Sequence, residues 1–201
     1  MFKRILQVLL LPLSLAAAPA FAAALVGQPA PDFTLSDVAG KPVKLSDFKG
    51  RFVVLEWVNP DCPYVQRHYD SANMPTLQKE TGGKNVAWLS INSTRAGHSE
   101  FKTPAQMSDW TKKKNATPAA TLLDPDSKVG KAYGATTTPH MYVIDPKGQL
   151  IYVGAIDDKR SASLEETKNA KNYVRAALGD SMAGKPVMVS STVSYGCTVK
   201  Y

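Results

Sequence analysis

Apolar residues fall into short runs along this chain, and the most continuous run covers residues 52–58 (Phe-Val-Val-Leu-Glu-Trp-Val). Such a run, rich in β-branched residues, favours a strand that is buried on both faces. Asn59, Pro60 and Asp61 then end it with residues typical of turns. Pro63 favours the first position of a helix, where a missing N–H costs nothing. The pattern therefore predicts strand, turn and helix, with Cys62 at or beside the helix N-cap.

The other elements are predicted from periodicity and from capping signals. Alternation in 30–37 and 41–45 indicates a two-stranded antiparallel lead-in, followed by a short helical or turn segment at 46–50. Further strands are predicted at 85–92, 120–123, 141–145 and 150–156, the last two as a hairpin. Helices are predicted from 63 toward 80 with a break at 73–75, and at 103–114, 129–133 and 165–178. The final segment, 186–201, alternates only weakly.

The first 22 residues have the pattern of a cleaved signal peptide. Lys3 and Arg4 form a basic start, 5–15 is an apolar stretch too short to span a bilayer, and Ala20-Phe21-Ala22 is an A-x-A cleavage signal. We expect cleavage after Ala22, an exported protein in the bacterial periplasm, and no membrane contact after cleavage. Cleavage two residues later, or an uncleaved anchor, is the alternative.

Composition limits the remaining chain to one domain. Of 201 residues, 179 are left after removal of 22, enough for a single core. Loss of Lys3 and Arg4 lowers the formal net charge from +7 to +5. The densest basic run, 112–114, ends a predicted helix, where cations are favourable. We therefore expect no nucleic-acid partner and a single domain over 23–201.

The two cysteines, Cys62 and Cys197, are 135 positions apart (197 minus 62). A thiol at a helix N-terminus meets unpaired N–H donors and the positive end of the helix dipole, which favour the thiolate form. Cys62 is thus expected to be a redox nucleophile. The alternative is a structural disulfide in a redox-silent binding domain, which would be worth about 4 to 5 kcal/mol on the chain-entropy account.

Three stretches resemble the AhpC/TSA (peroxiredoxin-like) redoxins of the thioredoxin superfamily: Ala30-Pro31-Asp32-Phe33, residues 45–50 (Leu-Ser-Asp-Phe-Lys-Gly), and Thr138-Pro139. The order of predicted elements is similar as well. The resemblance implies an α/β, thioredoxin-like fold, a central mixed sheet flanked by helices with an N-terminal β-hairpin. It also implies a thiol oxidoreductase without a cofactor, acting on a thiol or disulfide protein partner or on a peroxide.

The cysteine motif departs from both branches of that superfamily. The tetrad Cys62-Pro63-Tyr64-Val65 keeps the attacking cysteine of Cys-x-x-Cys and has valine in place of the second. Against the peroxiredoxin pattern Pro-x-x-x-Thr/Ser-x-x-Cys, Leu55 and Asn59 stand where proline and the hydroxyl residue would be. Cys197 is the candidate resolving cysteine, because a second thiol completes such chemistry. The sequence leaves its distance from Cys62 open.

Further site residues are implied by the resemblance. Pro139 corresponds to the cis-proline of thioredoxins and should face Cys62, leaving the Thr138 backbone free to pair with an extended substrate. Pro63 and Tyr64 complete the expected substrate site. Glu56, six residues before Cys62, matches the buried acid of thioredoxins, where a raised pKa would suit a proton relay to sulfur. The alternative is an acid that reaches solvent at the strand end.

Histidine and methionine near the cysteine raise a copper-binding alternative, in which Cys62 and His140 or Met141 would supply soft ligands. The chain lacks the Cys-x-x-x-Cys pair of thioredoxin-fold copper chaperones, so no metal is expected. His140 follows Pro139 and should point away from it on an extended strand. His68 lies about 240° round the helix from Cys62, and His98 is expected in a solvated loop.

Overall fold

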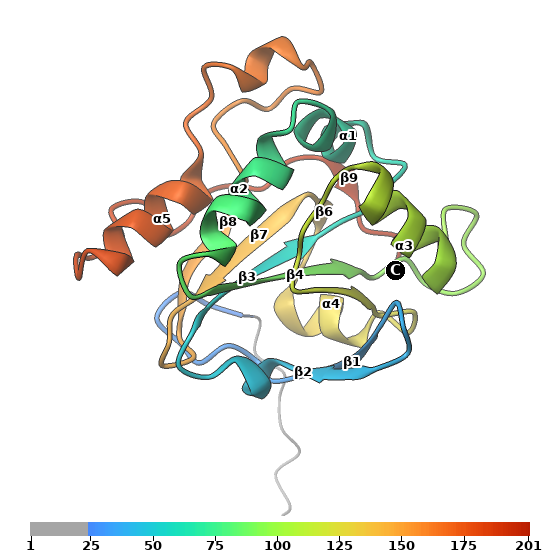
Figure 1. The fold of residues 1–201 in the computed structure, drawn as a ribbon, viewed down its shortest axis with the longest axis horizontal. Coiled ribbons are helices and arrows are strands. Elements are labelled where there is room, and N and C mark those ends of the chain that lie inside the picture. The colour runs from blue at the N-terminus through green and yellow to red at the C-terminus, as the bar shows by residue number, and fades with distance from the viewer. Residues whose placement is uncertain (1–23) are drawn as a thin grey trace, which may run out of the picture.

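The computed structural model describes residues 24–201, so the predicted signal peptide and its cleavage site lie outside the described residues (Figure 1). Within this range seven strands form one mixed sheet in the order β2-β1-β5-β4-β3-β7-β8. Their bounds are β1 Thr34–Asp37, β2 Pro42–Lys44, β3 Phe52–Trp57, β4 Val86–Asn92, β5 Ala120–Leu123, β7 His140–Ile144 and β8 Leu150–Gly154. A separate two-stranded sheet joins β6 (Thr137–Thr138) to β9 (Cys197–Thr198).

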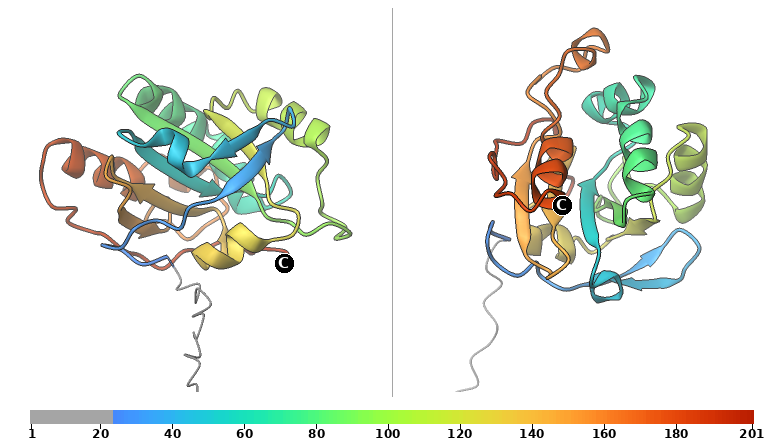
Figure 2. Two further views of the ribbon diagram at one scale, coloured as in Figure 1. Left: turned by 90° about the horizontal axis from the view of Figure 1, so that it is seen from below. Right: turned by 60° about the vertical axis from the view of Figure 1, so that its left-hand side comes forward.

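The sheet has the predicted thioredoxin-like α/β arrangement. Its centre is parallel, with β3 beside β4 and β4 beside β5, while β7 and β8 continue antiparallel from β3. The hairpin of β1 and β2 adds to the other edge by pairing antiparallel with β5, and Figure 2 shows it in blue at that side. The expected N-terminal β-hairpin extension is confirmed.

Alternation along β3 divides the core into two layers. Val54 faces a cluster formed with α1 (Pro63–Asp70), α2 (Asn73–Gly82), α3 (Pro104–Lys113) and α5 (Tyr173–Met182). Leu55 and Trp57 face the other cluster, formed with α4 (Lys128–Tyr133) and the N-terminal hairpin. A short 3-10 turn, η1 (Leu45–Phe48), precedes β3. Because both faces are covered, the run 52–58 is apolar on both sides.

The predicted break in the helix lies between α1 and α2, slightly before Pro75, the proline that predicts it. The backbone of Ala72 is left-handed, with φ of 58°, and α2 starts at Asn73. Pro75 lies in the first turn of α2, where proline is tolerated. In α3 the prediction is confirmed in detail, because Thr103 and Gln106 form a capping box around Pro104.

The predicted helix over 165–178 is wrong in both bounds. A 3-10 turn, η2 (Glu165–Thr167), is followed by a loop, and α5 starts at Tyr173 after the N-cap Asn172. Residues 165–170 have no large apolar side chain to bury. Gly179 does not end the helix, since an interior glycine costs only about 1 kcal/mol and the buried Val174 and Leu178 hold α5 on the sheet. Within 24–201, no helix is long and apolar enough to cross a membrane.

Candidate active site

Cys62 is the N-cap of α1, with Pro63 in the first turn, as the sequence predicts. Its side chain is only 1% exposed. The thiol donates a hydrogen bond to the carbonyl oxygen of Thr138 at 3.0 Å, and the Thr138–Pro139 peptide bond is cis. The N-terminus of α1 and the turn before β7 therefore meet at this sulfur.

Cys197 lies directly against Cys62. Strand β9 pairs antiparallel with β6, and this register puts Cys197 opposite Thr138. The two thiols are close enough for Cys62 to influence the titration of Cys197, and both cysteines are free. Burial first, and then the hydrogen bond and charge of Cys62, raise the pKa of the half-buried Cys197 thiol to about 12. The fold therefore brings Cys197 close to Cys62, which the sequence alone could not show.

The expectation that the Thr138 backbone is free for an extended substrate is wrong. Thr138 pairs with Cys197 and Thr137 with Thr198, so the chain's own β9 occupies this edge (Figure 1). Gly196 makes the approach close, because a Cβ placed on it would lie 2.0 Å from the Thr138 carbonyl oxygen. Sequence alternation in the final segment is too weak to reveal this pairing.

The segment 190–201, called the tail below, is anchored before it reaches Cys62. Its Thr192 lies along the edge of β8, where its hydroxyl accepts a hydrogen bond from the Ala155 N–H at 2.9 Å. Tyr195 is buried and packs edge-on against Tyr64 with ring centroids 5.8 Å apart. Tyr195 lies in the same core cluster as Cys62, and Tyr64 packs against that cluster.

A buried polar cluster under Tyr195 holds α1 and the tail together. Arg67 and Asp157 form an ion pair at 2.9 Å, with side chains 0% and 1% exposed. The Tyr195 hydroxyl donates to Asp157 and lies 3.3 Å from Nε2 of His68. Arg67 also donates to the carbonyls of Lys159 and Ser161. Sequence reasoning missed this cluster, because no local pattern links residues 90 positions apart.

The tail is anchored again after Cys197. Val199 is buried, and its N–H donates to the carbonyl of Thr136 at 3.1 Å. The carbonyl of Lys200 accepts from the N–H of Arg95 at 2.8 Å, and the Tyr201 hydroxyl donates to the carbonyl of Ala135. Cys197 is therefore held from both sides.

Glu56 is completely buried on β3, so the alternative of an acid reaching solvent is wrong. Burial raises its pKa from 4.5 to about 7, although hydrogen bonds from four side chains partly offset this. These donors are Trp88 at 2.8 Å, Tyr69 at 2.9 Å, Ser90 at 3.2 Å and Gln78 at 3.5 Å. Within residues 24–201 its hydrogen bonds reach neither thiol.

The three histidines lie apart from the two sulfurs. His140 stacks beside Tyr142 at 4.7 Å and pairs in register with Trp57, on the sheet face opposite Cys62. Burial lowers the pKa of His140 to about 4. Burial, followed by the charge of Arg67, lowers that of His68 to about 3. His98 lies in a loop, as predicted, where it is half-buried and accepts a hydrogen bond from the N–H of Glu100.

The described residues, 24–201, contain no group of three or more His, Cys, Asp and Glu side chains able to hold a metal ion. Met141 lies in the same core layer as Cys62, whereas His140 packs on Tyr142 in the opposite layer.

The positions that depart from the redoxin motifs have structural roles. Asn59 accepts a hydrogen bond from the N–H of Asp61 at 3.0 Å and donates to Glu100 at 2.6 Å, which stabilises the turn before Cys62. Val65 is completely buried among the helices, and Leu55 is buried on the opposite layer. Cys197, from another part of the chain, lies opposite Thr138, the residue whose carbonyl accepts the Cys62 thiol.

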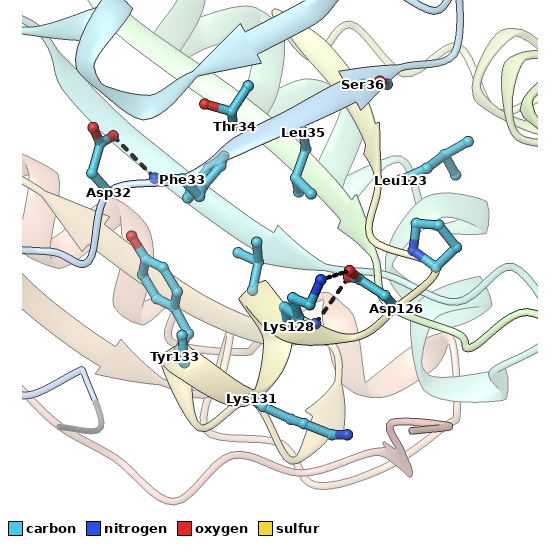
Figure 3. A pocket seen from close by; sticks show the side chains of 13 residues that line it. Asp32, Phe33, Thr34, Leu35, Ser36, Leu123, Asp126, Lys128, Lys131 and Tyr133 are labelled. Atoms are coloured by element: carbon cyan, nitrogen blue, oxygen red, sulfur yellow. Dashed lines mark hydrogen bonds and ion pairs between the residues drawn. The ribbon is translucent and has the colours of Figure 1, made fainter. Parts of the chain in front are cut away.

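The largest groove described lies elsewhere. It has a volume of about 720 Å³ and lies between β1 and α4, where Phe33, Leu35 and Tyr133 line its wall (Figure 3). Asp126 and Lys128 form an exposed ion pair at its rim. These residues belong to the layer opposite Cys62, and neither cysteine lines the groove.

The geometry is that of a thioredoxin-like protein with two adjoining thiols at a helix N-terminus and a cis-proline turn. The sequence profile of the AhpC/TSA family matches residues 26–153, so the chain belongs to that family. Among curated proteins, it is 26% identical over 166 residues to Synechocystis sll0755, provisionally named a peroxiredoxin (75% of this chain, 78% of that protein). It is 28% identical over 134 residues to the thiol-disulfide oxidoreductase ResA of Bacillus subtilis (63% and 65%).

Solved structures agree with this fold. An uncharacterized conserved protein from Geobacillus kaustophilus superposes with a TM-score of 0.76 at 29% identity, covering 88% of this chain and 92% of that one. The thioredoxin domain of a thiol-disulfide oxidoreductase from Bacteroides vulgatus superposes with a TM-score of 0.54 at 19% identity, covering 73% and 96%. The second likeness shows the shared fold alone.

Proposed function

We propose that this protein is a thiol-disulfide oxidoreductase in which Cys62 and Cys197 form one dithiol/disulfide couple. The observation that carries the proposal is the register of β9 on β6, which places Cys197 opposite Thr138, the residue whose carbonyl accepts the Cys62 thiol. Cys62 is the redox nucleophile in this proposal, because it is the N-cap of α1 and its thiol meets the Thr138 carbonyl before the cis-proline. Cys197 is its resolving partner. The similarity to ResA supports the exchange reaction.

Other residues have supporting roles in this proposal. The Thr138 carbonyl and Pro139 orient the sulfur of Cys62 from the turn before β7. Pro63 and Tyr64 form the surface beside it, where a partner would make contact. Glu56 holds a proton inside the core near neutral pH, because burial raises its pKa to about 7. It also accepts a hydrogen bond from the hydroxyl of Tyr69 on α1, and this bond helps to position the helix that carries Cys62.

The location of the protein in the cell is part of the same proposal. Residues 1–22 would direct export and be removed, leaving 23–201 as one redoxin domain in the bacterial periplasm, where a disulfide can persist. The partners would be thiol or disulfide proteins. N-terminal sequencing of the protein recovered from a periplasmic extract tests this, with Ala23 as the expected first residue.

The exchange reaction is tested by catalysed reduction of insulin disulfides with dithiothreitol as the electron donor. The wild-type protein should accelerate the reaction, whereas Cys62→Ser and Cys197→Ser should each lose most of the acceleration. Ser191→Ala, an exposed change on the tail, is the matched control and should retain it. Equal activity of the wild type and both cysteine variants would contradict the proposal.

Peroxide reduction by the same couple is the second candidate, supported by the AhpC/TSA match and by sll0755. The Cys62 thiolate would take one peroxide oxygen to become a sulfenic acid, releasing an alcohol or water. The Cys197 thiol would then condense with it to give the disulfide and water. Consumption of hydrogen peroxide with dithiothreitol as reductant tests this. Thiol exchange comes first because Asn59 stands where those peroxidases have a hydroxyl.

A further inference from the structure

The two sulfurs differ in their access to solvent. Cys62 is 1% exposed and lies in the core cluster with Tyr195, whereas Cys197 is half-buried at the margin of that cluster. Thiol-disulfide exchange needs direct approach of the attacking thiolate to a disulfide sulfur. An incoming group therefore meets Cys197 before it can meet Cys62.

The cover over Cys62 is built into the fold. Tyr195, two residues before Cys197, is hydrogen-bonded to Asp157. Val199, two residues after Cys197, is hydrogen-bonded to Thr136. Gly196 lies against the Thr138 carbonyl with no space between them. Exposure of Cys62 would require a movement of the segments around it, whereas Cys197 is already partly exposed.

Leaving-group chemistry points to the same sulfur. In exchange, the sulfur that leaves faster is the one whose thiolate is better stabilised. Attack on Cys197 expels Cys62, which leaves at the N-terminus of α1 beside the first-turn N–H groups. Attack on Cys62 would expel Cys197, which does not lie at a helix N-terminus and whose pKa burial raises. Access and leaving-group stability thus agree.

We propose that, in the oxidised protein, the partner's thiolate attacks Cys197 and not Cys62, so that the mixed disulfide forms on the tail. This rests on the proposed Cys62–Cys197 couple and reverses the usual expectation for the cysteine at the helix N-terminus. The partner is a protein dithiol. Near Cys197 the partner would meet the ion pair of Lys200 and Glu100, whose charged groups are 3.5 Å apart.

The electrons balance over two steps. First the partner's sulfur bonds to Sγ of Cys197, the Cys62–Cys197 bond breaks, and Cys62 leaves with the electron pair as a thiolate. Then the partner's second thiolate attacks the partner's own sulfur in the mixed disulfide. Cys197 leaves and takes up a proton, the partner holds a disulfide, and this protein holds two thiols.

The test uses the oxidised full chain and glutathione, a monothiol that cannot complete the second step within one molecule. The mixture is quenched with acid and N-ethylmaleimide, and the glutathionyl group is located by peptide mass spectrometry. We expect at least about tenfold more glutathione on Cys197 than on Cys62, with N-ethylmaleimide on the released Cys62. Glutathione mainly on Cys62 would overturn the inference and leave the couple itself intact.

A second variant tests the reason for this selectivity. Gly196→Ala forces the tail away from the Thr138 carbonyl and should raise the fraction of glutathione on Cys62. Gly148 also has a positive φ, 85° against 136° at Gly196, but nothing lies within 4 Å of the added Cβ, so Gly148→Ala should leave the fraction unchanged. An unchanged fraction in Gly196→Ala would overturn the role of the tail as a cover. Failure of the wild type to form any Cys62–Cys197 disulfide would contradict the proposed function as well.

Discussion

Gly196 lies so close to Thr138 that a methyl group on it would be 2.0 Å from the Thr138 carbonyl oxygen. The same carbonyl accepts the Cys62 thiol hydrogen bond, so one oxygen fixes both the tail and the nucleophile. Gly196→Ala must therefore displace β9 and separate the two sulfurs. We expect the rate of Cys62–Cys197 disulfide formation with diamide to fall about tenfold or more, measured by the loss of free thiols.

Gly148→Ala is the control for this substitution, since it carries the backbone cost of a positive φ without a collision. It should form the disulfide at the wild-type rate. If Gly196→Ala and Gly148→Ala oxidised equally fast, the close approach of Gly196 would not position Cys197.

The raised pKa of Glu56 should make the stability of the folded protein depend on pH. Its folded pKa, about 7, is above the unfolded value of 4.5, so its favourable contribution is complete below pH 4.5 and is lost as pH rises through 7. The difference corresponds to about 3 kcal/mol at 1.36 kcal/mol per unit. Glu56→Gln should retain the fold, because its amide oxygen can accept from Trp88 and its NH₂ can donate to the Tyr69 hydroxyl.

Urea unfolding of reduced wild type and Glu56→Gln between pH 4.5 and 8.5 measures this effect. The free energy of unfolding of the variant, relative to wild type, should increase by about 3 kcal/mol across that range. His68 and His140 titrate equally in both proteins, so their contribution cancels. A constant difference would show that folding does not raise the pKa of Glu56.

The hydrogen bond from Tyr195 to Asp157 should contribute to holding the tail in place. Tyr195→Phe keeps the packing on Tyr64 and removes the hydroxyl donor to the buried Asp157, which should cost about 1 to 3 kcal/mol in urea unfolding of the reduced protein. Tyr173→Phe, on the half-buried α5 residue beside Tyr152, is the matched control and should cost less than about 0.5 kcal/mol. Equal costs would argue against the polar cluster as the anchor of the tail.

Removal of the Cys62 sulfur should make Cys197 more reactive. Cys62 raises the pKa of Cys197 through its hydrogen bond and its charge, so Cys62→Ala leaves only burial and the charge of Glu100 to raise it. The pH profile of Cys197 alkylation by iodoacetamide should therefore move to lower pH than in the reduced wild type. A profile at equal or higher pH would contradict contact between the two thiols.

Much of the fold can be predicted from the sequence, because it depends on local patterns. The apolar run 52–58, the proline after Cys62 and the capping box at Thr103 each specify an element from neighbouring residues alone. The bounds of α5 could not be predicted in this way. There Gly179 is retained inside the helix by packing of Val174 and Leu178 on the sheet, which is a tertiary effect.

The site is less predictable, because its parts come together only through tertiary contacts. Cys62 can be singled out from its helix start, and Pro139 from its resemblance to the cis-proline of thioredoxins. Cys197 could be named only as a second thiol, since β9 has two residues and no strong alternation. The anchoring pair Arg67 and Asp157 has no local signal at all, because a charged residue on a helix is usually solvated.

The most direct test of the central claim is the redox equilibrium of the folded protein. The protein is incubated in dithiothreitol buffers of increasing reducing strength, and the Cys62–Cys197 disulfide is quantified by peptide mapping, with folding followed by tryptophan fluorescence. We predict that this disulfide forms and is reduced reversibly while the protein remains folded. A disulfide that resists reduction until the protein unfolds would show a structural bond, and the absence of any such disulfide would show no couple.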